Sequence, residues 1–181
     1  MRKQLRPTEV KRLNRAWRRS TENRLALILE SVTGPFNVGS IFRSAAAFGV
    51  DQIWLAGNAT PPTNPKAGKT ALGTERLVTW HPAVPATEAV KAAKEVGFAV
   101  LAIELTEEAV PLHRAGLDRD VCLVVGSEDH GCSPALLEAA DGVCYIPQVG
   151  RVGSFNVAVA AAIALSEARR QEWQDLSDPP G

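Results

Sequence analysis

The sequence predicts an α/β protein with an open, mostly parallel β-sheet and helices on both faces of that sheet. Short apolar runs recur along the chain, and segments with helical spacing of apolar residues separate them. Each run is apolar nearly throughout, whereas a strand with one solvent-exposed face would alternate polar and apolar residues. Strands buried on both faces and connected by helices form parallel sheets, so the pattern favours a doubly covered sheet.

The first half of the chain opens with helical character over residues 8–23, where Val10, Leu13 and Trp17 recur at three- and four-residue spacing. The elements predicted after it are a strand at 25–29, a helix at 36–48 that ends at Gly49, a strand at 53–55 and a strand-like segment at 77–80. Residues 56–73 are rich in Pro, Gly, Asn and Thr and are predicted to form one long loop.

The second half continues the alternation of helices and strands. Its predicted elements are a helix at 87–96, strands at 98–105 and 121–125, a short helix at 134–140 and a strand at 143–146. The alanine-rich stretch 157–165 predicts a final helix, which continues amphipathically through Arg169, Arg170 and Trp173.

The length of 181 residues fits one domain with a substantial core. We expect a basic helical extension at 1–24, the domain at 25–175 and a tail at 176–181. Three cysteines without a CxxC spacing favour neither a disulfide framework nor a zinc site. No apolar run is long enough for a membrane span, and the N-terminus has no apolar signal segment. We therefore expect a cytoplasmic protein that binds no metal and no membrane.

Charge is unevenly distributed, although the net charge is zero. Residues 1–24 contain nine Lys and Arg against two Glu, a balance of +7, which leaves −7 on the rest of the chain. This segregation favours a segment that binds a polyanion, and a solvated helix that aids solubility is the alternative.

Three polar clusters stand at strand ends or helix starts, where parallel sheets bind ligands. The first runs from Asn37 to Arg43, and its structural alternative is a helix cap at Asn37 with a surface cation at Arg43. The second, 126–131, follows an apolar run, but any strand-to-helix turn favours Gly, Ser and Asp. Its adjacent acidic and His residues do not suit a single metal centre.

The third cluster, 146–157, places a glycine-containing loop before the alanine-rich helix. Its Ser154 or Asn156 could cap that helix, or the loop backbone could bind the edge of a purine and a carboxylate. The sequence has neither a GxGxxG motif after the first strand nor a GxxxxGK[ST] motif. Common dinucleotide and nucleoside-triphosphate sites, and with them a Rossmann-type oxidoreductase, are therefore disfavoured.

Taken in order, the clusters resemble the SpoU (TrmH-like) family of RNA 2′-O-ribose methyltransferases, of the SPOUT superfamily. The family's N-x-G-x-x-x-R motif is met by Asn37, Gly39 and Arg43, and its G-x-E motif with a further Gly by Gly126, Glu128 and Gly131. The third motif is met by Ile146, Pro147, Ser154, Phe155, Asn156, Val157 and Ala158, and residues 69–73 look like a further loop of the family.

The resemblance implies a C-terminal deep trefoil knot, S-adenosyl-L-methionine as methyl donor, and a homodimer with its interface beside the donor site. The residues that it implies for the cofactor are Leu105, Gly126, Ile146, Ser154 and Asn156. It implies catalytic roles for Asn37, Arg43, Glu128, Ser154 and Asn156.

Within these implied roles, an arginine is a poor base, so we expect Arg43 to hold an RNA phosphate and stabilise the developing alkoxide. Asn37 would orient Arg43 or the ribose, and Glu128 would hold Arg43 as an ion pair. Ser154 and Asn156 would shape the loop that presents the cofactor.

The resemblance also bears on the partner of the basic extension. The expected RNA contacts there are Arg12, Arg15, Arg18 and Arg19, and the extension favours tRNA over ribosomal RNA as the substrate. A non-catalytic RNA-binding or assembly factor with the same fold is the alternative from another functional class.

Overall fold

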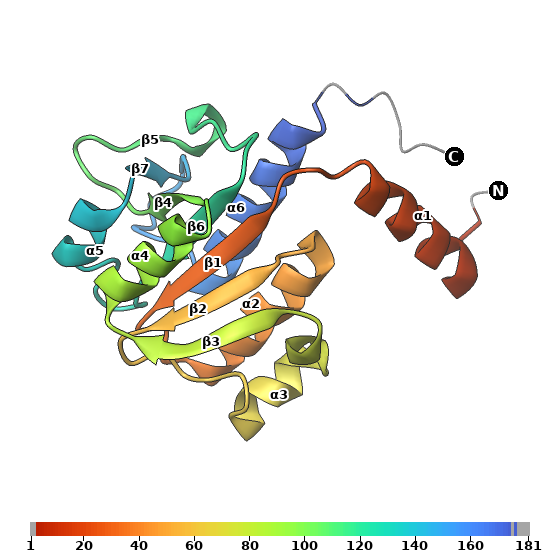
Figure 1. Ribbon diagram of the computed structural model, residues 1–181, viewed down its shortest axis with the longest axis horizontal. Coiled ribbons are helices and arrows are strands. Elements are labelled where there is room, and N and C mark those ends of the chain that lie inside the picture. Colours follow the sequence, from red (N-terminus) through yellow and green to blue (C-terminus); the bar gives the residue numbers. More distant parts are fainter. Residues whose placement is uncertain (1–2, 175, 177–181) are drawn as a thin grey trace.

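The computed structural model describes residues 3–174 and 176 and shows a seven-stranded sheet covered by helices on both faces (Figure 1). The strand order is β3-β2-β1-β6-β4-β7-β5, and all pairs between these strands are parallel. The predicted fold class is therefore confirmed. The trefoil knot stays a prediction from the resemblance.

The strands are β1 (Leu25–Glu30), β2 (Gln52–Ala56), β3 (Thr79–Val84), β4 (Ala99–Ile103), β5 (Val110–Pro111), β6 (Val121–Val125) and β7 (Gly142–Tyr145). The α-helices are α1 (Pro7–Arg19), α2 (Pro35–Phe48), α3 (Pro65–Ala71), α4 (Ala86–Glu95), α5 (Pro134–Ala139) and α6 (Val157–Glu172). Two short 3₁₀ helices are η1 (Thr74–Arg76) and η2 (Leu112–Arg114).

Alternation along the strands divides the core into two layers, which Figure 1 shows as helices on opposite sides of the sheet. Leu25, Leu27 and Leu29 of β1 belong to the layer beneath α2 and α6. Ala26 and Ile28 of the same strand belong to the layer beneath α4 and α5. All six residues of β1 are buried, because this strand lies inside the sheet and is covered on both faces.

Two parts of the chain differ from the prediction. Residues 56–73 are not one loop, because α3 lies within them, capped by Asn64, whose side chain accepts from the N–H of Lys66 at 2.9 Å. The predicted strand at 77–80 begins later, at Thr79, because η1 occupies the preceding turn. The two-residue strand β5 is too short to leave a sequence pattern.

The helix α1 stands away from the domain and buries none of its residues (Figure 1). Only its C-terminal end is anchored, where the rings of Trp17 and Trp173 lie 4.6 Å apart. The indole N–H of Trp173 also donates to the hydroxyl of Thr21 at 3.0 Å. The basic extension is thus held at one end, next to the end of α6.

A buried ion pair completes this anchor. Arg169 and Glu172 lie 2.6 Å apart, with side chains 3% and 8% exposed. The other carboxylate oxygen of Glu172 accepts from the N–H groups of Glu22 and Asn23, both at 2.7 Å. Arg169 also donates to carbonyls at Asn23, Phe48 and Gly49. Arg169 lies on the predicted C-terminal helix, and its guanidinium is buried and structural.

The helix α1 lies outside the core and β1 begins at Leu25, and the division of the chain at residue 24 stays a prediction. Most of the expected tail, 177–181, lies outside the described residues, as does Asp175. Within the part of the chain that the structure describes, no helix is long and apolar enough to cross a membrane.

Candidate active site

Side chains from the three polar clusters form one hydrogen-bonded chain near the carboxyl ends of β1 and β6. The side-chain Nδ2 of Asn37 donates to Oε1 of Glu128 at 2.9 Å. The Oδ1 of Asn37 accepts from Nδ2 of Asn156 at 3.1 Å. The partners are 91 and 119 residues apart in sequence. The topology of the sheet therefore brings the three clusters to one place, as their positions at strand ends predict.

The first cluster forms the opening turns of α2. Gly34 is the N-cap of this helix, so Asn37 is inside the helix and does not cap it. A Cβ atom at Gly34 would lie 2.8 Å from Oε1 of Glu128, so this glycine leaves room for the carboxylate beside Asn37. Gly39 has a different task, because a Cβ there would lie 2.2 Å from the carbonyl oxygen of Ala67 in α3. Because Gly39 has no side chain, α3 can pack tightly on α2.

The second cluster is a tight turn after β6. Ser127 and Gly131 exchange two backbone hydrogen bonds, of 3.0 and 2.9 Å, and place Glu128 in the turn. A Cβ at Gly126 would lie 2.2 Å from the backbone carbon of Gly131, so no larger residue fits there. Gly131 has a φ of +66°, which glycine adopts without strain. Both glycines of the motif thus shape the turn that presents Glu128.

The third cluster leads into α6, which Asn156 caps. Its Oδ1 accepts from the N–H groups of Ala158 at 3.0 Å and Val159 at 3.3 Å. Because that oxygen is used by the cap, the Nδ2 group is left to face Asn37. The capping role considered for Asn156 is confirmed, and it fixes the direction in which the amide points.

Arg43 takes no part in this chain of side chains. The expected ion pair between Glu128 and Arg43 is wrong, because Glu128 bonds Asn37 instead. Nor does Asn37 bond Arg43, since both ends of its amide are taken. Six residues along a helix correspond to a rotation of about 600°, so Arg43 faces about 120° away from Asn37. The guanidinium is exposed, and among the described residues it makes no ion pair.

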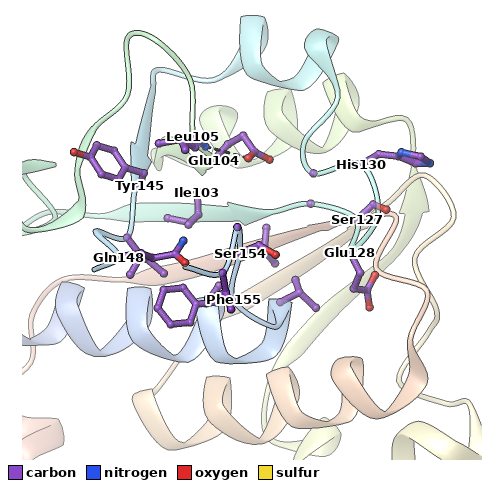
Figure 2. Close-up of a pocket in the computed structure, with 18 of the residues that line it drawn as sticks. Ile103, Glu104, Leu105, Ser127, Glu128, His130, Tyr145, Gln148, Ser154 and Phe155 are labelled. Carbon is purple, nitrogen blue, oxygen red and sulfur yellow. Dashed lines mark hydrogen bonds between the residues drawn. The ribbon is translucent and has the colours of Figure 1, made fainter. Parts of the chain in front are cut away.

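A cavity lies beside the hydrogen-bond network of Glu128, Asn37 and Asn156. Its volume of about 640 Å³ is within the range of small-molecule sites. Four of the five residues expected at the cofactor line it, namely Leu105, Gly126, Ile146 and Ser154. Asn156 lines a second cavity instead. Figure 2 shows Glu104 and Leu105 on one side of the space and Ser154 and Phe155 on the other.

Several lining residues were not predicted, among them Glu104, Tyr145 and Phe155. Glu104 and Tyr145 stand where β4 and β7 end, so the rule that ligands bind at the carboxyl ends of strands could have indicated them. Beside this cavity, a Cβ at Gly150 or Gly153 would meet no atom within 4 Å. The loop before α6 therefore has its backbone open to a bound molecule.

The second cavity, of about 780 Å³, runs along α2 and α6. Its wall is mostly apolar and includes Phe48, Ile163 and the half-exposed Val159, with Asn37 and Asn156 at one end. The network therefore lies between two cavities. One is lined by the loops that follow β4 and β6 and precede α6, and the other runs along α2 and α6.

The three cysteines lie inside the core of the domain. All three cysteines are free and buried. Burial raises the pKa of the Cys132 thiol far above its usual value, and the nearby Glu104 and Glu30 raise it further. Among the described residues, no group of three His, Cys, Asp or Glu side chains could hold a metal ion.

The expected RNA contacts of the extension share one face of α1. Lys11, Arg12, Arg15, Arg18 and Arg19 are all exposed. At 100° per residue they fall within an arc of about 120°, and Val10, Leu13 and Trp17 lie on another side. Since Trp17 contacts Trp173, the basic face is directed away from this anchor.

Comparison with known proteins identifies the family of this fold and site. Residues 24–166 match the model of the SpoU rRNA Methylase family. A tRNA (guanosine(18)-2′-O)-methyltransferase from Thermus thermophilus is 36% identical over 159 residues, 86% of this chain and 80% of that protein. A 23S rRNA (guanosine-2′-O-)-methyltransferase from Acinetobacter baylyi is 33% identical, over 84% of this chain and 62% of that protein.

An uncharacterized tRNA/rRNA methyltransferase from Synechocystis is 34% identical over 83% of this chain. This chain spans only 54% of the length of that relative.

Two solved structures have the same fold. The AdoMet-bound rRNA methyltransferase from Sinorhizobium meliloti superposes with a TM-score of 0.77 at 29% identity, over 84% of this chain and 58% of that one. A TrmH/SpoU tRNA modifying enzyme from A. aeolicus gives a TM-score of 0.75 at 28% identity, over 95% of this chain and 87% of that one. From the matched motifs, the fold and these likenesses, the chain belongs to the SpoU methylase family.

Proposed function

We propose that the protein transfers a methyl group from S-adenosyl-L-methionine to a ribose 2′-hydroxyl of RNA. The observation that carries this proposal is the Glu128–Asn37–Asn156 network beside a cavity of about 640 Å³. Two similar proteins, from Acinetobacter baylyi and Thermus thermophilus, are guanosine 2′-O-methyltransferases. A solved relative is named as AdoMet-bound.

The residues of the cavity suit such a donor. Ile103, Leu105 and Phe155 offer apolar and aromatic surface to a base, and the open loop backbone offers hydrogen bonds. When bound, the donor supplies a methyl group on a positively charged sulfur. The role of the protein is to align the ribose oxygen with that methyl group. Such alignment lowers the activation barrier by about several kcal/mol or more in well-oriented systems.

The network supplies this alignment from the protein side. Each amide is held by partners at both ends, so neither Asn37 nor Asn156 can turn without losing a hydrogen bond. In the proposal, this rigid wall positions the target ribose. Among the described residues no carboxylate pairs with Arg43, which leaves its planar guanidinium to bind an RNA phosphate and stabilise the developing alkoxide.

We propose tRNA as the substrate, with the basic face of α1 contacting its phosphates. The relatives are divided between tRNA and ribosomal RNA enzymes, so ribosomal RNA is the second candidate. The experiment is transfer of labelled methyl to purified tRNA and to 23S rRNA, followed by mapping of 2′-O-methyl sites. Methylation of neither RNA, with donor binding intact, would favour the non-catalytic RNA-binding factor.

We also propose a homodimer that covers the cavity along α2 and α6. Its apolar wall and the exposed Val159 are surfaces that a second copy would bury next to Asn37 and Asn156. A Val159→Asp variant should then sediment as a monomer, whereas the wild-type protein should sediment at twice that mass.

A further inference from the structure

Glu104 is placed at the cavity by two backbone hydrogen bonds. It directly follows β4, and its Oε1 accepts from the N–H of Leu105 at 3.0 Å. Its Oε2 accepts from the N–H of Cys132 at 2.9 Å, across the turn that follows β6. Because both carboxylate oxygens are held, the negative charge has a fixed position on the cavity wall.

The turn is shaped to admit this carboxylate. A Cβ at Gly131 would lie 2.1 Å from Oε2 of Glu104, so only a glycine allows the carboxylate to approach. Gly131 therefore serves two purposes, the positive φ of its turn and the space for Glu104. The same contact ties the turn that carries Glu128 to the end of β4.

The charges on the cavity wall are of one sign. Its lining includes the carboxylates of Glu104, Glu128 and Asp129, and none of the described residues that line it is a Lys or Arg. Glu128 is bonded to Asn37 on α2. The remaining titratable side chains of the lining are His130 and Tyr145, and Figure 2 shows His130 pointing outward from the cavity. Glu104 is thus a fixed negative charge without a Lys or Arg partner among the described residues of the cavity wall.

We propose that Glu104 makes the cavity select the cationic methyl donor over its demethylated product. This inference rests on the proposed function. In methyl transfer the ribose oxygen forms a bond to the methyl carbon, the carbon–sulfur bond breaks, and the hydroxyl proton is released. The sulfur keeps the electron pair and becomes a neutral thioether, so the bound molecule loses one positive charge.

Because of that loss of charge, the carboxylate of Glu104 attracts the donor but not the product. The attraction between the carboxylate and the sulfonium favours binding of the donor and disappears once the methyl has left. Donor and product share every other group, so their contacts with the loops are otherwise the same. Glu104 therefore acts as a specificity residue that speeds exchange of spent product for fresh donor.

The test measures binding of S-adenosyl-L-methionine and of S-adenosyl-L-homocysteine by calorimetry. In the wild-type protein the donor should bind more tightly than the product. Glu104→Gln removes the charge at nearly constant shape, and should lower the ratio of the two affinities by about fivefold or more. Glu104→Asp keeps the charge and should preserve most of that ratio, even if a shifted turn weakens both ligands. Glu107→Gln, at an exposed position outside the cavity lining, is the matched control and should change neither affinity.

The outcomes are distinguishable. Equal weakening of both ligands in Glu104→Gln would show that the residue only holds the turn, and the inference would be wrong. Tighter binding of product than donor in the wild-type protein would overturn it without any variant. Failure of the wild-type protein to bind either ligand would overturn the proposed function as well.

Discussion

Asn156 donates a side-chain hydrogen bond to Asn37 at 3.1 Å while its oxygen caps α6. One side chain thus joins the start of α6 to the start of α2. A change at Asn156 therefore alters both the cap of α6 and the wall of the candidate site, whereas a change at Asn37 alters the wall alone.

This relationship predicts the behaviour of Asn37→Ala. The variant should keep the fold, because Asn156 still caps α6, but a misplaced ribose should lower the rate of methyl transfer by about 100-fold. Affinity for the methyl donor should stay within a few-fold, since Asn37 does not line that cavity. Single-turnover kinetics and calorimetry measure the two quantities. Near-normal turnover would show that the network is only structural.

Arg43 gives a second prediction, which depends on geometry as well as charge. Arg43→Ala should abolish methyl transfer, and Arg43→Lys should also be poor, because an ammonium group cannot reproduce a planar guanidinium. Donor affinity should be nearly unchanged in both variants. Lys69→Ala, at an exposed position of α3, is the comparison variant that tests loss of a positive charge alone. A lysine variant with full turnover would contradict the alignment role.

The anchor of α1 gives a third prediction. Trp173→Ala removes an aromatic contact that contributes about 0.5–1.5 kcal/mol, and so loosens the attachment of the basic helix. Affinity for RNA should fall several-fold, and donor binding should not change.

The basic face itself is tested by the salt dependence of RNA binding. Replacing Arg12, Arg15, Arg18 and Arg19 with Gln should flatten the plot of log affinity against log salt. The slope should decrease by about 0.7–0.9 for each phosphate contact that is lost. An unchanged slope would mean that the helix faces solvent in the complex.

The buried cysteines predict how the folded protein reacts with alkylating agents. Burial raises the pKa of Cys144 to about 12, and it raises the pKa of Cys122 and Cys132 as well. Since the thiolate is the reactive form, the native protein should resist alkylation at pH 7.5, and all three thiols should react in denaturant. Mass spectrometry after labelling counts the modified residues. Rapid modification of the folded protein would contradict their burial.

The pair of Arg24 and Asp120 predicts a dependence of stability on pH. Burial raises the pKa of Asp120, but hydrogen bonds from the backbone and guanidinium of Arg24, with its charge, hold the pKa below the ordinary 3.8. Ionised Asp120 therefore stabilises the fold above about pH 4, and this contribution is lost as the pH falls through the folded pKa.

Asp120→Asn should accordingly lower the free energy of unfolding by about 0.5–1 kcal/mol at pH 7, because the pair is partly exposed. The difference between wild type and variant should shrink as the pH falls from 7 to 3. Denaturant titrations at both pH values measure this, with exposed Asp118→Asn as the control. A difference that persists at pH 3 would assign the effect to packing.

The elements that the sequence predicted well are those with a local signal. The strand at 121–125 is correct to the residue, because the apolar run is bounded by the charged Asp120 and by Gly126. The helix α3 was missed because its Pro, Gly and Lys residues resemble a loop, and its cap at Asn64 is a short-range feature within that composition. The partner of Glu128 was mistaken because a contact across 91 residues depends on how two turns are oriented. The spacing of residues in the sequence carries no information about that orientation.

The helix α6 has Asn156 as its cap at one end and the buried Arg169–Glu172 pair in its last turn. That pair holds the segment that follows α1. The 16 residues of α6 form a rod of about 24 Å, which α2 and the sheet hold in place. Under the proposed function, the length of α6 sets the distance between the ribose that is modified and the phosphates that α1 contacts. An RNA would then be chosen by the distance between two points on its surface, and lengthening α6 by one turn would change which nucleotide arrives at the site.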